Sequence, residues 1–561
     1  MSDVPSFDQA VAALTSASGS PFEIVEQEID GSLVKVFANL PSSLRESFAA
    51  TRLNAEKPFL VYEDETWTFA DTMGRVDEIA DALVHRYGVE PGDRVAIAMR
   101  NYPEWITSFA AITSVGAIAV CMNAWWKAEE MAYGLEDSGA KVLLADIERV
   151  NTAGGSLARL GVKAIVVRHE GDVPEGVDRL VDVLRPGAAM PEVEVGPGDD
   201  ATILYTSGTT GFPKGAVSTH HAVLSALRAF ACRALVGAMT QPAKEPNPFD
   251  PCFILAVPLF HVTGLVPVML SCFLNGIKLV MMYKWSPERA LELVERERVT
   301  QFVGVPTMTI DLLESPDFDA RDTSSLASVG GGGAPAPPEM VSRVDKSFAR
   351  ARPGLGYGMT ETNAYGPQNA GDDYVRKPRS SGRAIPVLQV QCFDENMKPL
   401  GPNEVGEICF RGPNLIRGYW NKPEATAETI VDGWLRSGDL GRIDEEGFVF
   451  VEDRAKDMVL RAGENIYCAE VEATIYEFED VHEAAVFGMP HDRLGEEVAC
   501  AILPKKGRTL DIEALTLHVS VKLAKFKVPT IVEVVKEALP RNASGKILKR
   551  DIRDELISRR S

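Results

Sequence analysis

Residues 205–215 read Tyr205-Thr206-Ser207-Gly208-Thr209-Thr210-Gly211-Phe212-Pro213-Lys214-Gly215. The stretch combines four serine and threonine hydroxyls, three glycines and one lysine. Glycines let backbone N–H groups approach an anion closely, and hydroxyls donate further hydrogen bonds. A lysine adds a compact positive charge that suits phosphate. The sequence therefore predicts a loop that binds phosphate groups.

The residues on either side of this loop predict where it lies. The apolar run 201–205 is typical of a buried strand, and residues 218–236 are predicted to form a helix. We expect the loop to join that strand to that helix, since helix N-termini favour anions. The loop differs from the P-loop of kinases and ATPases, in which Gly-Lys is followed by Ser or Thr. Here Lys214 follows Pro213 and precedes Gly215.

Length and charge restrict the class of protein. A chain of 561 residues is too long for one hydrophobic core, so two or more domains are expected. The 80 acidic and 58 basic residues give a net charge of −22, which argues against general nucleic-acid binding. The eight cysteines include no Cys-x-x-Cys pair, which predicts reduced thiols in a cytoplasmic protein and no zinc site.

No targeting or membrane segment is predicted. The first residues lack the basic and apolar regions of a signal peptide. The longest membrane-like run, residues 106–122, is short for a span and contains a glycine. A buried helix followed by a buried strand explains that run better, so we expect no transmembrane segment.

The order of predicted elements indicates an α/β protein. After a helical arm in residues 1–50, apolar strands alternate with helices over residues 59–145 and again over 253–347, on either side of a linker at 186–199. Apolar strands alternating with helices predict two α/β subdomains with parallel sheets covered on both faces. Antiparallel strands from residue 387 predict a small β-rich subdomain. The segment beyond residue 454 predicts a small α+β C-terminal domain.

Several motifs carry residue types that suit a nucleotide. Gly356-Tyr357-Gly358-Met359-Thr360-Glu361 combines an aromatic ring for a base, a hydroxyl for phosphate and a carboxylate for Mg²⁺. Asp439 follows Ser437-Gly438, and a carboxylate can accept hydrogen bonds from two vicinal ribose hydroxyls. The run Gly330 to Gly333, followed by Ala334, is expected to follow a strand and to present bare backbone to a flat ligand.

Three further motifs add basic side chains. His261 is predicted to end a strand, and a histidine there could contact a substrate carboxylate. Asp453-Arg454-Ala455-Lys456-Asp457 is a charged run where the composition changes. Residues 540–548 hold Lys546 in a loop that could bring a positive charge to a carboxylate and a phosphate.

Taken together, the motifs resemble those of the acyl-adenylate-forming (AMP-binding) enzymes, and in particular the fatty-acyl-CoA synthetases. Six motifs occur in that family's order, and the resemblance extends from about Leu44 to Arg553. It implies that Lys546, Thr360, Glu361 and His261 act in catalysis, with Glu361 holding magnesium. It assigns the binding of cofactors to Thr206, Ser207, Gly208, Thr209, Thr210, Gly211, Lys214, Gly332, Gly333, Ala334, Tyr357, Gly358, Thr360, Asp439, Arg454, Lys456 and Gly463.

The same resemblance implies a domain plan and a reaction. Residues 1–453 would bind nucleotide and acid, 454–456 would form a hinge, and 457–561 would form a mobile lid. A carboxylic acid would react with ATP and Mg²⁺ to give acyl-AMP and pyrophosphate, and coenzyme A would then accept the acyl group. Near Gly463 the resemblance implies a passage for the thiol. Dimers are common in that family, so a homodimer is one expected state.

Other functions remain open at this point. The acceptor could be a carrier protein instead of coenzyme A, and the chain could be a phosphoryl-transferring ATPase or a nucleotide-binding protein without catalysis. Residues 123–126 and the loop at 463 resemble medium- to long-chain fatty-acyl ligases. The glycine run leaves room for a bulkier aromatic or terpenoid acid.

Overall fold

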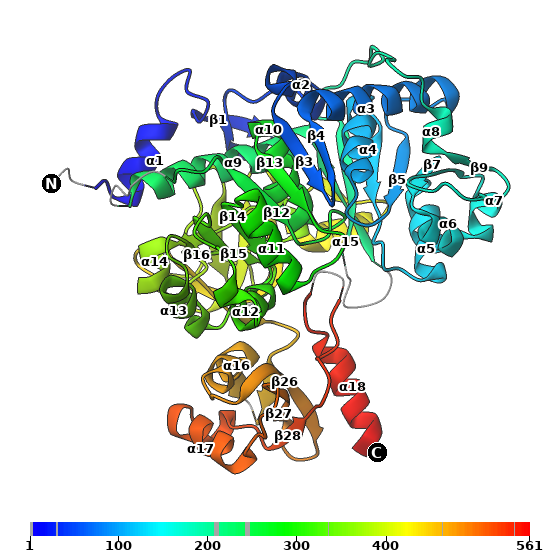
Figure 1. Cartoon of the computed structure of the whole chain (residues 1–561). Coiled ribbons are helices and arrows are strands. Elements are labelled where there is room, and N and C mark those ends of the chain that lie inside the picture. The colour runs from blue at the N-terminus through cyan, green and yellow to red at the C-terminus, as the bar shows by residue number, and fades with distance from the viewer. Residues whose placement is uncertain are drawn as a thin grey trace.

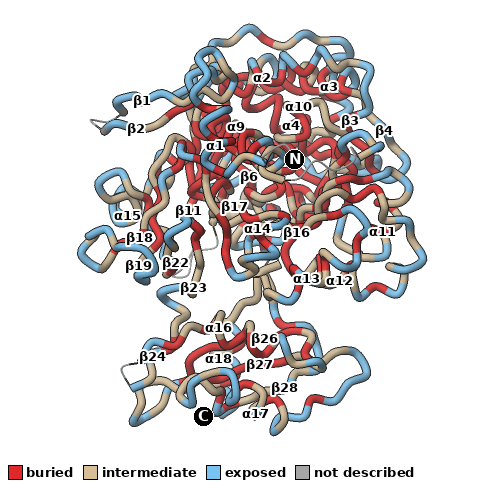
Figure 2. Tube along the Cα trace, turned by 90° about the vertical axis from the view of Figure 1, so that its left-hand side faces the viewer, coloured by how far each residue is buried: buried red, intermediate tan, exposed pale blue. Residues whose placement is uncertain are grey.

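The computed structural model shows a large N-terminal domain and a small C-terminal domain below it (Figure 1). The residues that the structure describes are 4–29, 32–206, 213–241, 247–334, 336–462, 464–542 and 545–560. The loop residues 207–212 and Gly463, which the sequence singled out, lie outside these ranges. In Figure 2 the buried part of the chain forms one extensive core in the large domain and a separate one around β26 (Val481–His491) and β27 (Gly495–Pro504).

Two eight-stranded sheets form the large domain. The first has the order β20 (Gly418–Tyr419), β11 (Lys214–Thr219), β10 (Asp200–Thr206), β6 (Ile118–Cys121), β5 (Arg94–Ala98), β7 (Val142–Ala145), β8 (Lys163–Val166) and β9 (Val177–Arg179). The second has the order β17 (Gln368–Ala370), β16 (Arg352–Gly356), β15 (Ser328–Gly332), β14 (Gln301–Gly304), β12 (Cys252–Leu255), β13 (Lys278–Met281), β3 (Pro58–Tyr62) and β4 (Glu65–Thr68). Both contain mostly parallel strands, which confirms the predicted α/β class.

Helices surround these sheets and bury their apolar faces. The helices of the large domain are α1 (Phe7–Thr15), α2 (Leu44–Ala50), α3 (Phe69–Asp81), α4 (Pro103–Ser114), α5 (Ala128–Ser138), α6 (Ile147–Ala153), α7 (Gly155–Leu160), α8 (Leu180–Val183), α9 (His220–Met239), α10 (Ser271–Asn275), α11 (Pro287–Glu297), α12 (Pro306–Glu314), α13 (Pro338–Ser347), α14 (Gly371–Arg376) and α15 (Pro423–Thr429). By length and composition α9 could cross a membrane, but over half of its apolar window is buried in the protein.

The division of the chain between the two sheets differs from the prediction. The hairpin β3–β4 was expected in the first α/β unit, but β3 pairs with β13 of the second sheet. Conversely, β10 and β11 follow the predicted linker yet complete the first sheet. Pairing partners far apart in sequence cannot be read from local patterns, because every buried parallel strand has the same apolar composition.

Three local expectations also need correction. The phosphate-loop segment joins two antiparallel strands, β10 and β11, and the helix begins only at His220. The side chain of Thr219 accepts a hydrogen bond from the N–H of Ala222 at 3.1 Å and so sets this later start. In the N-terminal arm, a hairpin of β1 (Ile24–Ile29) and β2 (Ser32–Phe37) separates the two helices.

Glycines 330 to 332 lie within β15 instead of following it. A Cβ atom at Gly331 would lie 1.6 Å from the carbonyl oxygen of Gly304 on β14, and one at Gly330 would lie 2.1 Å from that of Gly354 on β16. The bare backbone therefore permits close approach of neighbouring strands, as well as leaving the face of the sheet open.

Replacing Gly331 with alanine should destabilise the large domain. The new methyl group meets backbone that cannot rotate away, so we expect a loss of about 3 kcal/mol in the free energy of unfolding. Gly354→Ala is the matched control, because the nearest atom to its Cβ would be the carbonyl oxygen of Asn369 at 3.9 Å. Thermal unfolding followed by intrinsic fluorescence would test this. Equal melting temperatures for the two variants would contradict it.

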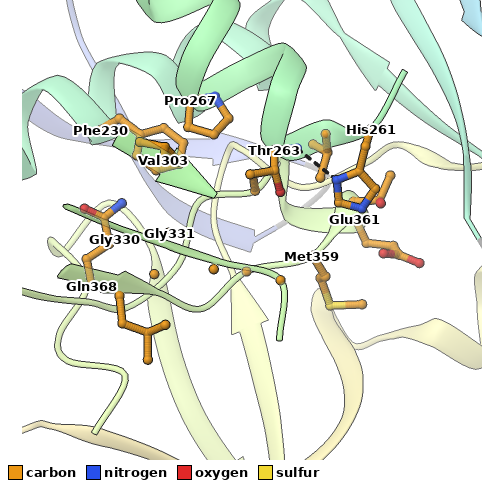
Figure 3. A pocket seen from close by; sticks show the side chains of 18 of the residues that line it. Phe230, His261, Thr263, Pro267, Val303, Gly330, Gly331, Met359, Glu361 and Gln368 are labelled. Atoms are coloured by element: carbon orange, nitrogen blue, oxygen red, sulfur yellow. Dashed lines mark hydrogen bonds between the residues drawn. The ribbon is translucent and has the colours of Figure 1, made fainter. Parts of the chain in front are cut away.

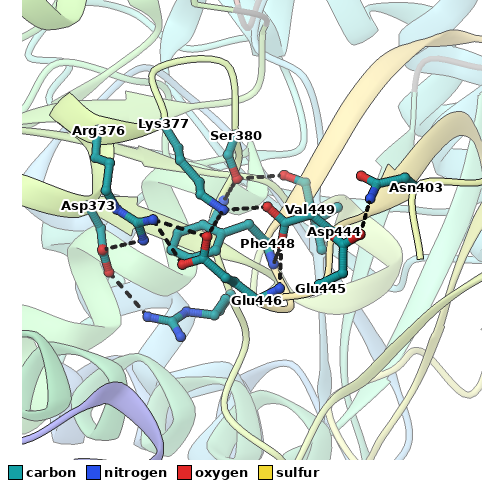
Figure 4. A network of polar contacts seen from close by, with 12 residues as sticks. Asp373, Arg376, Lys377, Ser380, Asn403, Asp444, Glu445, Glu446, Phe448 and Val449 are labelled. Carbon is teal, nitrogen blue, oxygen red and sulfur yellow. Dashed lines mark hydrogen bonds and ion pairs between the residues drawn. The ribbon is translucent and has the colours of Figure 1, made fainter.

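A five-stranded antiparallel sheet adds the predicted β-rich subdomain. It contains β18 (Gln389–Phe393), β19 (Gly406–Arg411), β21 (Ile430–Val431), β22 (Trp434–Ile443) and β23 (Val449–Arg454). A network of ion pairs connects the β22–β23 turn of this sheet to α14 (Figure 4). Lys377 pairs with Asp444 and with Glu446, and Arg376 pairs with Glu446 at 2.8 Å. This network holds β22 and β23 against the second sheet.

The C-terminal domain is built on a separate five-stranded sheet. It contains β24 (Val459–Arg461), β25 (Glu464–Ile466), β26, β27 and β28 (Ile531–Val534), with α16 (Cys468–Tyr476), α17 (Ile512–Lys522) and α18 (Lys549–Arg560). The chain leaves the β-rich sheet at Arg454 and enters this one at Val459. All eight cysteines are free and buried, as the sequence predicts.

Candidate active site

A cavity of about 1860 Å³ lies between the two domains. It brings together most of the predicted site residues, although they come from segments far apart in the chain. Those that line it are Thr206, Lys214, His261, Gly332, Gly333, Gly358, Thr360, Glu361, Arg454, Lys456 and Lys546. Tyr357, Asp439 and Ala334 are not among the lining residues, but Gly358, Gly438 and Leu440 beside them are.

Glu361 is a buried carboxylate at the wall of this cavity. Its side chain accepts a hydrogen bond from the hydroxyl of Tyr419 at 2.6 Å, and burial raises the pKa of Glu361. The ring of Tyr419 in turn lies 5.0 Å from the ammonium of Lys214, a cation–π contact. Tyr419 thus links the end of the phosphate loop to the carboxylate.

The site fits a divalent cation that is bound mainly through phosphate. Among the described residues, Glu361 has no ion-pair partner, and no group of three metal-ligating side chains occurs. Magnesium bound with nucleotides commonly takes one or two carboxylates and completes its shell with phosphate oxygens and water. A lone buried carboxylate beside a lysine suits that arrangement.

The backbone around Glu361 folds back on itself. Residues 360–362 form a 3₁₀ turn, and Asn363 and Ala364 after it both have positive φ angles. A Cβ at Gly358 would lie 2.3 Å from the carbonyl oxygen of Ala364. The motif therefore needs a glycine at this position to bring Thr360 and Glu361 to the cavity.

Asp439 lies on β22 directly opposite Arg454 on β23. Its carboxylate accepts a hydrogen bond from the hydroxyl of Tyr357 at 2.7 Å and pairs with Nε of Arg454 at 3.3 Å. Burial raises the pKa of Tyr357, with the charge of Asp439 adding to that effect. The three residues predicted to hold adenosine are thus joined into one cluster.

Lys546 reaches the same cavity from the C-terminal domain. Its N–H donates to the side-chain oxygen of Asn542 at 2.9 Å, which closes a tight turn with Gly545 at φ +85°. Gly545 packs so closely on Val305 of the large domain that a Cβ there would lie 3.0 Å from the valine side chain. Burial lowers the pKa of Lys546 to about 8, and the positive charge of Arg454 contributes.

His261 lies after β12 and lines the cavity, where Figure 3 shows it near Thr263 and Glu361. Its Nδ1 accepts a hydrogen bond from the N–H of Thr263 at 3.3 Å. Burial lowers the pKa of His261 to about 4, so the ring is neutral near pH 7. A neutral imidazole with Nδ1 as acceptor carries its proton on Nε2 and can donate one hydrogen bond.

Sequence reasoning missed Tyr419. The segment Arg417-Gly418-Tyr419-Trp420 offered a weak signal, a glycine followed by two aromatic residues. The position of Tyr419 depends on β20, a two-residue strand that pairs with β11 and brings Tyr419 to Lys214 and Glu361. That pairing joins residues about 200 positions apart in the chain and has no local pattern.

Comparisons with known proteins agree with this geometry. The family model "AMP-binding enzyme" matches residues 48–420, and "AMP-binding enzyme C-terminal domain" matches residues 470–546. A feruloyl-CoA synthase from Amycolatopsis sp is 36% identical over 488 residues, which cover 87% of this chain and 93% of that protein. The long-chain-fatty-acid–CoA ligase FadD13 of Mycobacterium tuberculosis (strain ATCC 25618 / H37Rv) is 33% identical over 501 residues, covering 88% of this chain and 93% of that protein.

A solved structure supports the fold. The anthranilate CoA ligase AuaEII, in complex with anthranoyl-AMP, superposes with a TM-score of 0.84 at 26% sequence identity. The superposition covers 93% of this chain and 99% of that one. The likeness thus includes both domains.

Proposed function

The chain belongs to the AMP-binding enzyme family and is an AMP-forming ligase that uses ATP, Mg²⁺ and coenzyme A, and we propose that it activates a carboxylic acid at the cavity between its two domains. One observation carries the assignment of this site: Lys546 of the small domain lines the same cavity as Lys214 and Glu361 of the large one. A positive charge delivered by a second domain suits a reaction in which negative charge develops on phosphate.

The first half-reaction forms a mixed anhydride. An oxygen of the substrate carboxylate bonds to the α-phosphorus of ATP, and the bond from that phosphorus to the bridging oxygen breaks, releasing pyrophosphate. Lys546 and Thr360 stabilise the charge that develops on the α-phosphate, and Lys214 with residues 206–211 holds the β- and γ-phosphates. Glu361 would hold Mg²⁺, which supplies further charge neutralisation on the phosphates. Positioning and electrostatics provide the catalysis.

The second half-reaction transfers the acyl group to a thiol. The thiol sulfur of coenzyme A attacks the acyl carbonyl, its proton is lost to solvent, and AMP leaves with the electron pair of the broken C–O bond. We place the lid at residues 457–561, turning about a hinge at 454–456, so that Lys546 withdraws between the two halves. The large domain would then be 1–453, and the segment around Gly463 would face the thiol.

The acid is a medium- to long-chain fatty acid, an aromatic acid or a terpenoid acid. Relatives of similar identity are named for ferulate and for long-chain fatty acids, so these two classes have equal support. The part of the cavity lined by Phe230, Val303 and the glycines of β15 could hold either chain or ring (Figure 3). A cytoplasmic location and a homodimer stay predictions.

A panel of acids would test the function. Each acid is incubated with ATP and Mg²⁺, with coenzyme A in one arm and a phosphopantetheinylated carrier protein in the other. We expect AMP and pyrophosphate in equal amounts, and an acyl thioester in the coenzyme A arm. A thioester formed only on the carrier would favour the carrier-loading alternative, and ADP with phosphate would favour an ATPase.

The pKa of Lys546 predicts a fall in adenylation at alkaline pH. The reaction needs the protonated amine, whose pKa is about 8 in the free enzyme, so kcat/KM should be constant below that value. It should fall by about tenfold per pH unit well above it. The measurement is pyrophosphate release at low ATP concentration from about pH 7 to pH 10. Lys546→Arg is the control, because a guanidinium stays protonated over this range; a parallel fall in both enzymes would contradict the assignment.

A further inference from the structure

Arg233 on α9 is a buried cation that lines the active-site cavity. The residue is only 7% exposed, and its Nη2 donates to the carbonyl oxygen of Gln368 at 2.9 Å. Its Nε has no hydrogen-bond partner. Among the residues that the structure describes, no carboxylate forms an ion pair with it.

Neighbouring arginines differ from Arg233 in this respect. Arg352, which also lines the cavity, pairs with Asp345 at 2.8 Å, and Arg383 pairs with Asp373 at 3.2 Å. The guanidinium of Arg233 instead lies 5.4 Å from the ring of Phe7. A cation–π contact offsets only part of the cost of desolvating a charge. Burial lowers the pKa of Arg233, yet a guanidinium stays protonated at neutral pH.

Arg233 lies at the end of the pocket remote from the reacting carboxylate. Figure 3 shows Gln368, its hydrogen-bond partner, and Phe230, one helical turn before it, at the opposite end from Glu361 and Met359. Gln241 also lines this cavity, and its side chain lies against Gly371, which follows β17, at the same end. An all-hydrocarbon substrate would leave the Arg233 guanidinium without a charged partner in the cavity.

We propose that the preferred acid carries a second carboxylate at its far end, and that this carboxylate pairs with Arg233. The proposal rests on the function proposed above and narrows its substrate class. The planar guanidinium can donate two parallel hydrogen bonds to a carboxylate, which fixes the orientation of the substrate as well as its charge. An acid that ends in a methyl group is disfavoured, because it buries the guanidinium without an ion-pair partner.

Matched pairs of acids provide the test. Each pair has one length and one backbone and differs only at the far end, a carboxylate in one member and a methyl group in the other. The pairs are α,ω-dicarboxylic and monocarboxylic acids of graded length, and 4-carboxycinnamic and 4-methylcinnamic acid. In wild type we expect at least one pair in which the second carboxylate raises kcat/KM for pyrophosphate release by about tenfold or more. A methyl preference in every pair would overturn the proposal.

Variants of α9 separate recognition from folding. Arg233→Met should reverse the preference within the best pair, and Arg233→Lys should retain part of it. Arg228→Met is the matched control, since Arg228 also donates to a backbone oxygen, that of Pro21 at 2.8 Å, and contacts the ring of Phe22, but does not line the cavity. It should keep the wild-type preference.

The outcomes also separate this proposal from the proposed function. If Arg233 only fastens α9 to β17, Arg233→Met and Arg233→Lys will lower the melting temperature and leave the preference between paired acids unchanged, which overturns the proposal. If no acid of either kind supports pyrophosphate release by wild type, the proposed function itself is wrong. If wild type is active only with methyl-ended acids, the proposed function stands and only the proposal of a second carboxylate is wrong.

Discussion

Replacing Lys546 with alanine will lower the rate of acyl-adenylate formation by about 10²–10³-fold. The lysine is a cation that the small domain brings to the cavity, and its turn is held by Asn542 and by the contact of Gly545 with Val305. Removal of the side chain beyond Cβ leaves that turn in place, since its hydrogen bonds involve the backbone of residue 546. The loss should therefore appear in kcat and not in stability.

The measurement is single-turnover pyrophosphate release, with Lys506→Ala as the control. Lys506 is an exposed lysine of the same domain and does not line the cavity. A second readout starts from synthetic acyl-AMP and follows transfer to coenzyme A, which Lys546→Ala should slow far less. Full-rate adenylation by Lys546→Ala would show that the lysine has no catalytic part.

Glu361→Gln should lower kcat/KM for Mg-ATP by about 10²-fold. The amide has the shape of the carboxylate and can still accept the hydrogen bond from Tyr419, so the substitution removes the negative charge and little else. The loss then reports the interaction with Mg²⁺. Titration with Mg²⁺ at fixed ATP should show that the variant needs a higher Mg²⁺ concentration for half-maximal rate.

Two controls accompany this variant. Glu428→Gln makes the same charge change at an exposed residue that lines the same cavity, and it should leave the Mg²⁺ dependence unchanged. Tyr419→Phe keeps the ring beside Lys214 but removes the hydroxyl, and it should lower kcat/KM by about tenfold at most. Equal losses for Glu361→Gln and Glu428→Gln would mean that the net charge of the cavity matters and the position of Glu361 does not.

Local patterns predicted much of the fold. The antiparallel pairing of β3 with β4 follows from two short apolar runs and a tight turn, and α11 from its apolar spacing after a serine cap. These elements depend on neighbours in sequence. The membership of β3 in the second sheet depends on its contact with β13, which local sequence does not encode.

The site shows the same limit. The sequence predicted Glu361, Asp439 and Lys546, because each stands in a motif whose residue types suit a nucleotide and its phosphates. The sequence did not indicate that Tyr357 and Asp439 bond to each other, because that contact joins two different sheets. Arg233 lies in a segment for which the sequence predicted only a helix. Its proposed part in substrate recognition rests on its burial without an ion-pair partner among the described residues, which only the folded structure shows.

Transfer of labelled oxygen tests the central claim most directly. The enzyme is incubated with ATP, Mg²⁺, coenzyme A and a substrate acid whose carboxylate carries ¹⁸O, and the products are analysed by mass spectrometry. If the carboxylate attacks the α-phosphorus, one ¹⁸O atom of each acid molecule will appear in AMP, and pyrophosphate will be unlabelled. Label in inorganic phosphate, together with ADP, would show attack at the γ-phosphorus and contradict this account.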